Sequence, residues 1–485
     1  MTFNFNKAYS KTVNINNTLE LISIIDWGDG TVTDFSKITD KYTSEYMAPS
    51  HTYSENKEYK CYIWSNDPTV VPGYAFDGLG DALTDIKIPY GVKIIGEFAF
   101  AGSYKNVREL ELPDSVEKVD AYAFAGAGIE HIKFSKRLKE IEQSAFIANN
   151  LKEIILPEGL ESLGSYSFGE CNYATEIYVP RSVQSIPQDT FVLSTSTPEL
   201  EKITIPFVGQ DRSDTNSYFG FIFGAQDPLE SHSLMVPASL KTIVVTEGNN
   251  GKLPSYAFNF CPHVESVELA DSITSVEYYA FSDCYKLHSI KFSNNIQVIG
   301  EGAFVNCSSL EHVVLPAKLE SLHSVAFNSC SNLNSIKFGN SVQQINNATF
   351  ADCQSLKEVV LPESLSSVAG NAFSQCTALE KLTIEGTQTV MDEHESPFYG
   401  CTSIQKIIVP IEALDTYKNM TALAEYKDKI VAIVDTNHIV NNEDSAPVSW
   451  APDTKSAGSS FTWNFNFKLK PKHLYSFIVT CPSGE

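Results

Sequence analysis

The sequence predicts a mainly β solenoid, a rod of short coils that stack along one axis and share one core. Two patterns that recur together predict this fold class. The first is a phenylalanine preceded by a small residue, and the second is a short alternating apolar segment ahead of it. Most steps between copies are 22 to 24 residues long, and such a period is typical of stacked repeats. The phenylalanines are Phe76, Phe100, Phe124, Phe146, Phe168, Phe191, Phe258, Phe281, Phe304, Phe327, Phe350 and Phe373.

The alternating segment predicts one short strand in every coil. An apolar residue is followed at the third and fifth positions by two more, often with a closing proline, as in LEHVVLP. This alternation is typical of a strand with one buried face, and proline ends the strand because it lacks a backbone donor. A third element, such as SVEKV, links strand and phenylalanine. The fourteen segments begin at Leu83, Val107, Ile129, Leu151, Ala174, Leu200, Leu240, Val264, Leu287, Leu310, Leu333, Leu356, Leu379 and Ile404.

The combined pattern LxxIxLPxxVxxIgxxAFxxC, seen here as LEHVVLPAKLESLHSVAFNSC, resembles the BspA-type leucine-rich repeats of bacterial and some protist surface proteins. The resemblance covers roughly residues 70 to 410. It implies a right-handed solenoid over residues 69–410, with short strands joined by turns or short helices. The core of a solenoid grows in one dimension, so a chain of 485 residues need not divide into several globular domains.

Eight of the ten cysteines lie three residues after a repeat phenylalanine. Earlier coils carry Ser103, Ala127 and Asn149 there, so the position requires a small residue rather than sulfur. We therefore expect free thiols that pack in the interior as small hydrophobic groups. A disulfide ladder would need pairs that the substituted coils lack, and a zinc site usually shows C-x-x-C pairing. The eight are Cys171, Cys261, Cys284, Cys307, Cys330, Cys353, Cys376 and Cys401.

One unit, between Pro206 and Leu240, is about ten residues too long for a single coil. Its extra residues should project as a loop, and loops on rigid scaffolds often carry binding function. We expect the repeat's phenylalanine position here to be filled by Phe223. The alternative is that all four aromatic residues of the unit point inward, while its aspartates only solvate the loop. The candidate ligand-binding residues are Asp211, Asp214, Tyr218 and Phe219.

Residues 1–68 predict a small β-sandwich-like domain. The segments IDWGDGTVTDF and SHTYSENKEYKCYIWSND resemble the PKD-type β-sandwich of extracellular proteins. Asp26, Asp29 and Asp34 are expected to stabilise tight turns, and binding of a calcium ion by their carboxylates is the alternative. His51 is expected to be a packed or hydrogen-bonded residue.

The C-terminal part predicts three further segments. Residues 411–434 place apolar side chains at helical intervals and should cap the open end of the last coil. Residues 435–460 are polar and rich in turn formers, as in a linker. Residues 461–485 alternate on both sides of Pro471 and predict a β-hairpin, which needs something to dock on because an isolated hairpin is marginally stable.

Composition excludes several classes of function. The net charge of −24 disfavours nucleic acid and anionic membrane surfaces as partners. No run of eighteen apolar residues predicts a membrane span, and MTFNFNKAYS lacks the features of a secretion leader. The protein is nevertheless expected outside the cell or on its surface, as the family resemblance implies.

No catalytic motif stands out. The sequence contains no G-x-S-x-G, no phosphate-binding G-x-x-x-x-G-K-[ST] and no H-E-x-x-H, and it implies no cofactor. The acidic stretch Asp392–Glu395, which includes His394, is expected to be a solvated loop rather than a metal or acid–base site. Three histidines, near strand starts in different coils, are expected to face solvent: His131, His288 and His312.

Two functions follow from the sequence. The first is a non-catalytic scaffold, secreted or on the cell surface, that mediates adhesion by binding an extracellular protein or a host matrix component. The second is a glycan-binding accessory protein, or a non-catalytic subunit of a carbohydrate-processing system, because PKD-like modules often accompany such systems. Exposed aromatic residues on one face would favour the glycan, and their absence would favour a protein partner.

Overall fold

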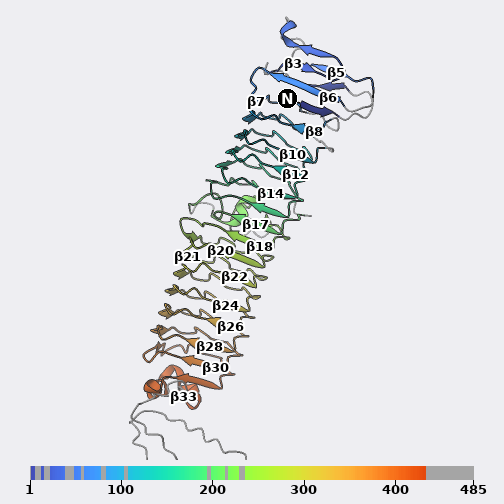
Figure 1. Cartoon of the computed structure of the whole chain (residues 1–485). Helices are drawn as coiled ribbons and strands as arrows, with labels where there is room; N and C mark the ends of the chain where they lie inside the picture. Colours follow the sequence, from blue (N-terminus) through green and yellow to red (C-terminus); the bar gives the residue numbers. More distant parts are fainter. Residues whose placement is uncertain are drawn as a thin grey trace, which may run out of the picture.

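The computed structural model in Figure 1 is a long rod of stacked coils, with a small sheet at the N-terminal end and a short helical segment at the other. It describes residues 2–5, 12–15, 22–38, 49–55, 59–77, 83–102, 107–193, 198–213, 217–228 and 235–432. Over this part of the chain, the predicted mainly β solenoid is confirmed.

Each alternating segment forms a strand, and neighbouring coils align these strands side by side in a first ladder. Along the ladder the pairing is parallel, and buried positions alternate with outward ones, as at buried Val313 between His312 and Val314. The fourteen predicted strands are β8 (Leu83–Lys87), β10 (Glu109–Glu111), β12 (His131–Lys133), β14 (Glu153–Ile155), β16 (Glu176–Tyr178), β17 (Lys202–Ile205), β18 (Thr242–Val245), β20 (Ser266–Leu269), β22 (Ser289–Lys291), β24 (His312–Val314), β26 (Ser335–Lys337), β28 (Glu358–Leu361), β30 (Lys381–Ile384) and β32 (Lys406–Val409).

The linking element of each coil forms a second ladder of two-residue parallel strands. Next to the lengthened unit it is reduced to isolated bridges, in which Ser185 of the preceding coil pairs with Ser162 and with Asp211. The strands are β7 (Val70–Val71), β9 (Ile94–Ile95), β11 (Lys118–Val119), β13 (Glu140–Ile141), β15 (Ser162–Leu163), β19 (Lys252–Leu253), β21 (Ser275–Val276), β23 (Val298–Ile299), β25 (Ser321–Leu322), β27 (Gln344–Ile345), β29 (Ser367–Val368) and β31 (Val390–Met391).

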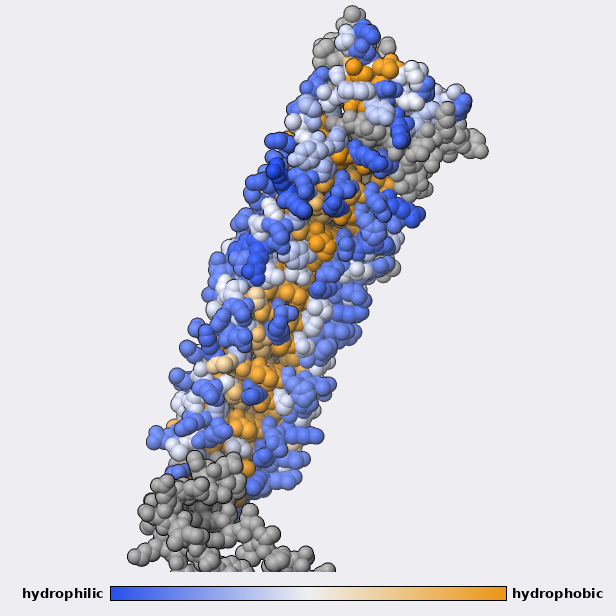
Figure 2. All heavy atoms as spheres, in the orientation of Figure 1, coloured by the Kyte–Doolittle hydropathy of each residue, from blue (hydrophilic) through white to orange (hydrophobic). Residues whose placement is uncertain are grey.

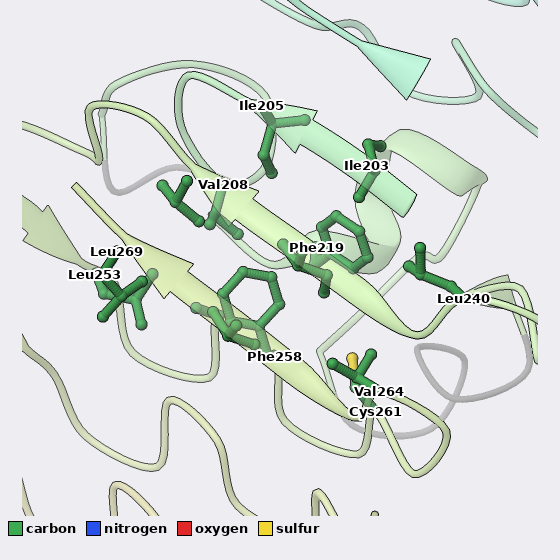
Figure 3. Close-up of a cluster of buried hydrophobic side chains, with 14 of the residues drawn as sticks. Ile203, Ile205, Val208, Phe219, Leu240, Leu253, Phe258, Cys261, Val264 and Leu269 are labelled. Atoms are coloured by element: carbon green, nitrogen blue, oxygen red, sulfur yellow. The ribbon is translucent and has the colours of Figure 1, made fainter. Parts of the chain in front are cut away.

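The repeat phenylalanines stack along the rod axis inside the coils. The rings of Phe304 and Phe327, both fully buried, have centroids 5.0 Å apart and planes 6° from parallel. Similar contacts run from Phe76 to Phe191 and from Phe258 to Phe398. Figure 3 shows how Phe258 packs among aliphatic side chains from both ladders. Each ring therefore contacts the coils on either side, which couples the stability of neighbours.

The turns around most repeat phenylalanines contain two left-handed residues, one two positions before the ring and one two positions after it. For Phe281 these are Tyr279, with φ 50°, and Asp283, with φ 61°. Non-glycine residues adopt this conformation at some energetic cost, and β-branched Val325, with φ 50°, does so as well. The backbone hydrogen bonds of the turn offset this cost, since Phe281 N–H donates to Ala303 in the next coil at 2.7 Å.

The first ladder opens between β10 and β8, which pairs with β1 instead, and at three further places in the described repeats that each follow a coil with an extra phenylalanine. Phe134, Phe292 and Phe338 occupy the position that is leucine in other coils, such as Leu315. Strand β12 does not pair with β14, nor β22 with β24, and β26 pairs with β28 only through Ser335 and Glu358.

Each extra phenylalanine packs edge-on against a ladder ring, with centroid distances of 5.6, 5.6 and 5.8 Å. A ring is bulkier than leucine in a close-packed core, so we infer that it displaces the following strand. The second ladder stays paired at all three places.

The N-terminal residues form antiparallel sheets, which confirms a β region at this end. One sheet has the order β4-β3-β6-β1-β8, and a second joins β2 and β5. Strand β8 belongs to the first repeat but pairs with β1, so the N-terminal sheet continues into the solenoid. The likeness to a PKD domain stays a prediction. The elements are β1 (Thr2–Phe5), β2 (Thr12–Asn14), β3 (Ile22–Asp26), β4 (Val32–Asp34), η1 (Phe35–Lys37), β5 (Ser50–Thr52) and β6 (Tyr59–Ser65).

After β32 the chain forms η4 (Ile411–Ala413), α3 (Leu414–Lys418), η5 (Thr421–Lys429) and strand β33 (Ile430–Ala432). Tyr417, Leu423 and Tyr426 are buried against the last coil, as their helical spacing predicts. Strand β33 extends the first ladder by pairing with β32, which the sequence pattern did not predict. The predicted linker 435–460 and hairpin 461–485 lie outside the described residues, and the boundaries of the predicted domains remain predictions.

Candidate binding surfaces

The outward side chains of the first ladder form a continuous face along the rod, here called the strand face. Figure 2 shows hydrophobic residues in a band along the rod with hydrophilic residues on both sides. On the strands themselves, four apolar residues at the same outward position are exposed. They are Ile155 (43 %), Val314 (66 %), Val360 (44 %) and Val431 (37 %). They share one outward row with charged residues of other coils, such as Lys337 opposite Val314, so the row alternates apolar and charged positions.

Charged residues on the strand face pair between neighbouring coils. Lys202 lies 2.8 Å from Glu176, and Lys381 lies 3.3 Å from Glu358. Lys291 pairs with Glu268 in the same way. These lysines are largely exposed, so each pair contributes little to stability. The Lys202 and Lys381 pairs lie in a row beside the apolar positions, whereas the Lys291 pair lies in the same row as Ile155.

Predicted solvent exposure of the three strand-start histidines is confirmed. His131, His288 and His312 are all exposed, and Nδ1 of His312 lies 2.7 Å from the hydroxyl of Ser335 in the next coil. They lie in different coils. The structure therefore does not bring them together.

The lengthened unit begins with a loop that polar side chains hold in place. Asn249 is buried, and its side-chain amide donates to the carbonyl oxygens of Val208, Asp211 and Ser213 at 2.9 to 3.1 Å. Its own carbonyl accepts from Val208 N–H at 3.0 Å. One side chain thus fixes the backbone of the loop. Asn249 was not identified from the sequence. The only local signal for it is its place shortly after strand β18.

Arg212 secures the outer side of the same loop. Its guanidinium donates to the carbonyl oxygens of Val183 and Arg181, at 3.0 and 2.7 Å, and to the carboxylate of Glu247 at 2.7 Å. It also lies over the ring of Phe207, 4.8 Å from the centroid. The described part of the loop, up to Ser213, is therefore held by side chains on both sides.

The candidate residues of the lengthened unit have different environments. Asp211 is half-buried, and its carboxylate accepts from Ser213 N–H at 2.6 Å, while Asp214 lies outside the described residues. Tyr218 and Phe219 are buried, as the inward-pointing alternative expects, and ligand binding by the four candidate residues stays a prediction. For aromatic rings of this size, burial in the core is more favourable in free energy than exposure to water.

The phenylalanine position of this unit is shared by two rings of helix η3 (Phe219–Phe223). Phe191 N–H donates to the carbonyl oxygen of Ile222, so Phe223 takes the next position in the phenylalanine stack, as predicted. Phe219 N–H donates to Ala257, and its ring packs 5.2 Å from that of Phe258. The two rings meet edge to face at 5.3 Å. A 3₁₀ turn places both rings on the core side, which the spacing of the sequence did not reveal.

The three N-terminal aspartates stabilise separate turns. Asp26 accepts from Gly28 N–H at 2.9 Å, and Asp34 accepts from the N–H and hydroxyl of Ser36. Asp29 accepts from Thr31 and lies 2.7 Å from Nε2 of His51. No cluster of three or more potential metal ligands occurs among the described residues. The turn interpretation accounts for all three carboxylates.

His51 links the aspartate turn to the core of the N-terminal sheet. Its ring stacks on Trp27 at 5.1 Å and meets Tyr53 edge-on at 4.6 Å, which confirms the predicted packed histidine. Burial alone would raise the pKa of Asp29, but hydrogen bonds from Thr31 and the contact with His51 outweigh it and hold the pKa below its ordinary value.

The ladder cysteines are free and buried, as predicted. Burial raises the pKa of Cys171 and of Cys330 to about 12, so both thiols stay protonated at neutral pH. A protonated, buried thiol is a poor nucleophile and a poor metal ligand. The series of buried cysteines therefore has a structural role.

The acidic stretch Asp392–Glu395 is a surface turn. The carboxylate of Asp392 accepts from the backbone N–H groups of His394 and Glu395, which lowers its pKa, and Glu395 accepts from Asn371 at 2.8 Å. These bonds explain the cluster without a bound ion.

In the part of the chain that the structure describes, no helix is long and apolar enough to cross a membrane.

Comparison with known proteins gives one family and several solved structures. The family model for the BspA type leucine rich repeat region matches in six copies, over residues 69–198, 237–357 and 320–421. A leucine-rich repeat protein from Bacteroides ovatus is 24% identical over 79% of this chain and 90% of that chain, with a TM-score of 0.41. The leucine-rich repeat protein of T. pallidum is 27% identical over 34% and 77%, with a TM-score of 0.30. The pneumococcal vaccine antigen PcpA is 16% identical over 76% and 93%, with a TM-score of 0.27. No curated protein matches the sequence.

Proposed function

The chain belongs to the BspA-type leucine-rich repeat family, and on this basis we propose that it is a non-catalytic scaffold, secreted or on the cell surface, that binds an extracellular protein through its repeats. The observation that carries this proposal is the strand face, where exposed Val314 and Val360 stand beside rows of paired charges. Apolar residues flanked by polar ones are the usual composition of a protein interface.

Rigidity also supports a binding role. Most strands of the face carry a buried inward leucine, isoleucine or valine, so their outward side chains keep fixed spacings. A preorganised surface loses less conformational entropy on binding than a flexible one. The loop around Asp211, which the side chain of Asn249 holds in place, adds a local feature that a partner can distinguish from the regular coils.

The test is binding of the full chain to host matrix proteins, with fibronectin, fibrinogen and collagen as probes, measured by surface plasmon resonance. Val314→Glu and Val360→Glu together should weaken binding at least tenfold, because they place charges in the apolar row. Val390→Glu is the matched control, since Val390 is equally exposed (63 %) but lies on the second ladder. Equal loss in both variants, or none in either, would contradict a strand-face interface.

The second candidate function, a glycan-binding accessory role, is favoured by a separate observation. Several aromatic residues in the turns are exposed, among them Tyr166, Tyr173, Tyr278 and Tyr285. Exposed aromatic residues outside the strand face are what a sugar-binding surface requires. The same binding assay with immobilised glycans in place of proteins distinguishes the two functions.

A further inference from the structure

Two consecutive coils carry an unusual number of aromatic residues in their turns. Around Phe258, the left-handed positions hold Tyr256 and Phe260, and around Phe281 they hold Tyr279 and Asp283. Tyr278 and Tyr285 flank the second turn. Three of these rings are exposed, namely Phe260 (36 %), Tyr278 (39 %) and Tyr285 (44 %). We call this set, with Asn306, the turn platform.

The tyrosines of the platform hold one another in place. The ring of Tyr278 lies 4.3 Å from that of Tyr279 and 5.4 Å from that of Tyr256. The ring of Tyr279 covers Gly302 in the next coil, where a Cβ atom would lie only 2.6 Å from the ring. Gly302 has φ 61°, so glycine suits this position for both conformation and space. The aromatic surface is therefore preorganised.

Asp283 is the centre of the polar side of the platform. One carboxylate oxygen accepts from the Tyr285 hydroxyl at 2.9 Å and from the Asn306 amide at 2.8 Å, and the other accepts from Ser282 at 2.5 Å. Burial, followed by the bond to Asp283, raises the pKa of Tyr285, and burial raises that of Tyr279. The phenols are thus neutral hydroxyl groups that donate and accept hydrogen bonds.

We propose that the turn platform binds a neutral oligosaccharide, with the exposed rings against the C–H faces of the sugars and the Tyr285, Asn306 and Asp283 network bonded to their hydroxyl groups. Aromatic rings are amphipathic surfaces of low conformational entropy, and a sugar ring matches both their apolar faces and their polar edges. This site is separate from the strand face, so it stands or falls independently of a protein partner there.

Charge selects a neutral ligand over the alternatives. Asp283 accepts from three neutral donors, and Glu277 accepts from Ser275 at 2.6 Å and lies 3.8 Å from Lys252, so both carboxylates are already held by groups of the protein. An anionic glycan would meet a chain of net charge −24. A neutral sugar incurs no charge repulsion, and its hydroxyl groups can donate to the carboxylate of Asp283.

The platform adjoins the lengthened unit. Asn259, between Phe258 and Phe260, donates to the carbonyl oxygen of Pro228 at 3.2 Å, and the ring of Phe219 packs on Phe258. The departure from the regular repeat and the aromatic turns thus occupy neighbouring coils.

The test is isothermal titration of the full chain with cellohexaose, mannohexaose and tetra-N-acetylchitotetraose, beside a heparin hexasaccharide and hexaarginine. At least one neutral probe should bind. Tyr278→Ala should weaken it about tenfold, as expected for loss of one stacked ring. Tyr399→Ala is the matched control, since Tyr399 is exposed (62 %) in the turn of Phe398, away from the platform, and should leave affinity unchanged.

Tyr278→Phe keeps the ring, and its affinity for the sugar should be within about threefold of that of the unaltered protein. If Tyr278→Ala fails to fold, this variant still tests the proposal. Failure of all three neutral probes to bind would overturn the proposal. So would equal affinity in Tyr278→Ala and Tyr399→Ala, or binding of hexaarginine or heparin that Tyr278→Ala abolishes. If binding of a matrix protein is lost only in the strand-face variants and no sugar binds, the protein-binding function is supported and the turn-platform proposal is wrong.

Discussion

The thiol of Cys307 lies 3.1 Å from the carbonyl oxygen of Phe281 in the preceding coil, and that oxygen also accepts from the N–H of Cys284 at 3.3 Å. The contact recurs along the rod. Asn149 begins the series, since its amide donates to Phe124 at 2.8 Å, and Tyr426 ends it, since its hydroxyl donates to Phe398 at 3.0 Å. The cysteines between them that make the same bond are Cys171, Cys284, Cys330, Cys353, Cys376 and Cys401.

This series corrects the reason that the sequence suggested for the cysteines. A small size is required, but seven of the described thiols also give a buried carbonyl oxygen a second donor. Most of these oxygens already accept from a backbone N–H and sulfur is a weak donor, so each thiol bond contributes only modestly to stability. Ala127 shows that one coil tolerates the loss of the side-chain donor, because this position is fully buried alanine there.

All eight ladder thiols should be free in solution. Alkylation under denaturing, non-reducing conditions, followed by mass spectrometry, should label each of them. Alkylation of the folded protein at neutral pH should label none, because the thiols are buried and protonated. Two of them joined in an intrachain disulfide would refute the structural interpretation.

Stability should decrease at alkaline pH. Burial raises the pKa of Cys284 from 9.0 to about 12, so the folded state holds this proton more tightly than the unfolded chain. The resulting stabilisation is complete below pH 9 and is lost as the pH rises toward 12. We expect the free energy of unfolding, measured by urea denaturation, to fall across this range.

Cys307→Ser together with Cys330→Ser is the control for that experiment. Serine keeps a donor but does not ionise in this range, and the tyrosines that also titrate there are unchanged. The decline between pH 9 and 12 should be shallower in this variant. An identical slope would show that the thiols contribute nothing to it.

Phe304→Ala should destabilise the rod by about 3 to 5 kcal/mol, because it opens a cavity between the rings of Phe281 and Phe327. Hydrogen exchange should rise in the neighbouring coils as well. Val314→Ala, on the exposed strand face, should change stability by less than about 0.5 kcal/mol. Exchange that rises only in the altered coil would contradict coupling through the ring stack.

The gaps in the first ladder should follow the extra phenylalanines. Phe292→Leu should let β24 approach β22 and slow amide exchange there, because leucine fits this position in other coils. The reciprocal change, Leu315→Phe, should open the pairing of β24 with β26 and speed exchange at Ser335–Lys337. Both effects are measured by hydrogen exchange with mass spectrometry. Unchanged exchange in both variants would show that ring size does not set the gaps.

Replacing Gln210 to Ser217 with a short Gly-Ser linker should weaken binding of a partner that uses the lengthened unit. The linker also removes the bonds of Arg212, so a modest fall in melting temperature is expected. Arg212→Ala removes those bonds while keeping the other loop residues, and so separates anchoring from recognition. If the shortened protein melts normally and keeps its affinity, the loop is not the binding site.

The sequence by itself determined the features that repeat locally. Fourteen strand positions, the phenylalanine stack and buried free cysteines follow from a short period of apolar residues, since each coil folds against copies of itself. The turn roles of Asp26 and Asp34 were also readable, because their partners lie two residues away. His51 was expected to be bonded, but its partner Asp29, 22 residues away, was not identified.

Only the tertiary structure decided what happens between coils. The thiol-to-carbonyl bonds, the anchoring of the loop by Asn249 and the platform around Tyr278 and Asp283 join residues about one coil or more apart, so no local pattern shows them. The same holds for the sharing of one core position by Phe219 and Phe223. Which of several aromatic residues enters a core depends on the space that neighbouring coils leave, and packing is specified by that three-dimensional fit rather than by sequence spacing.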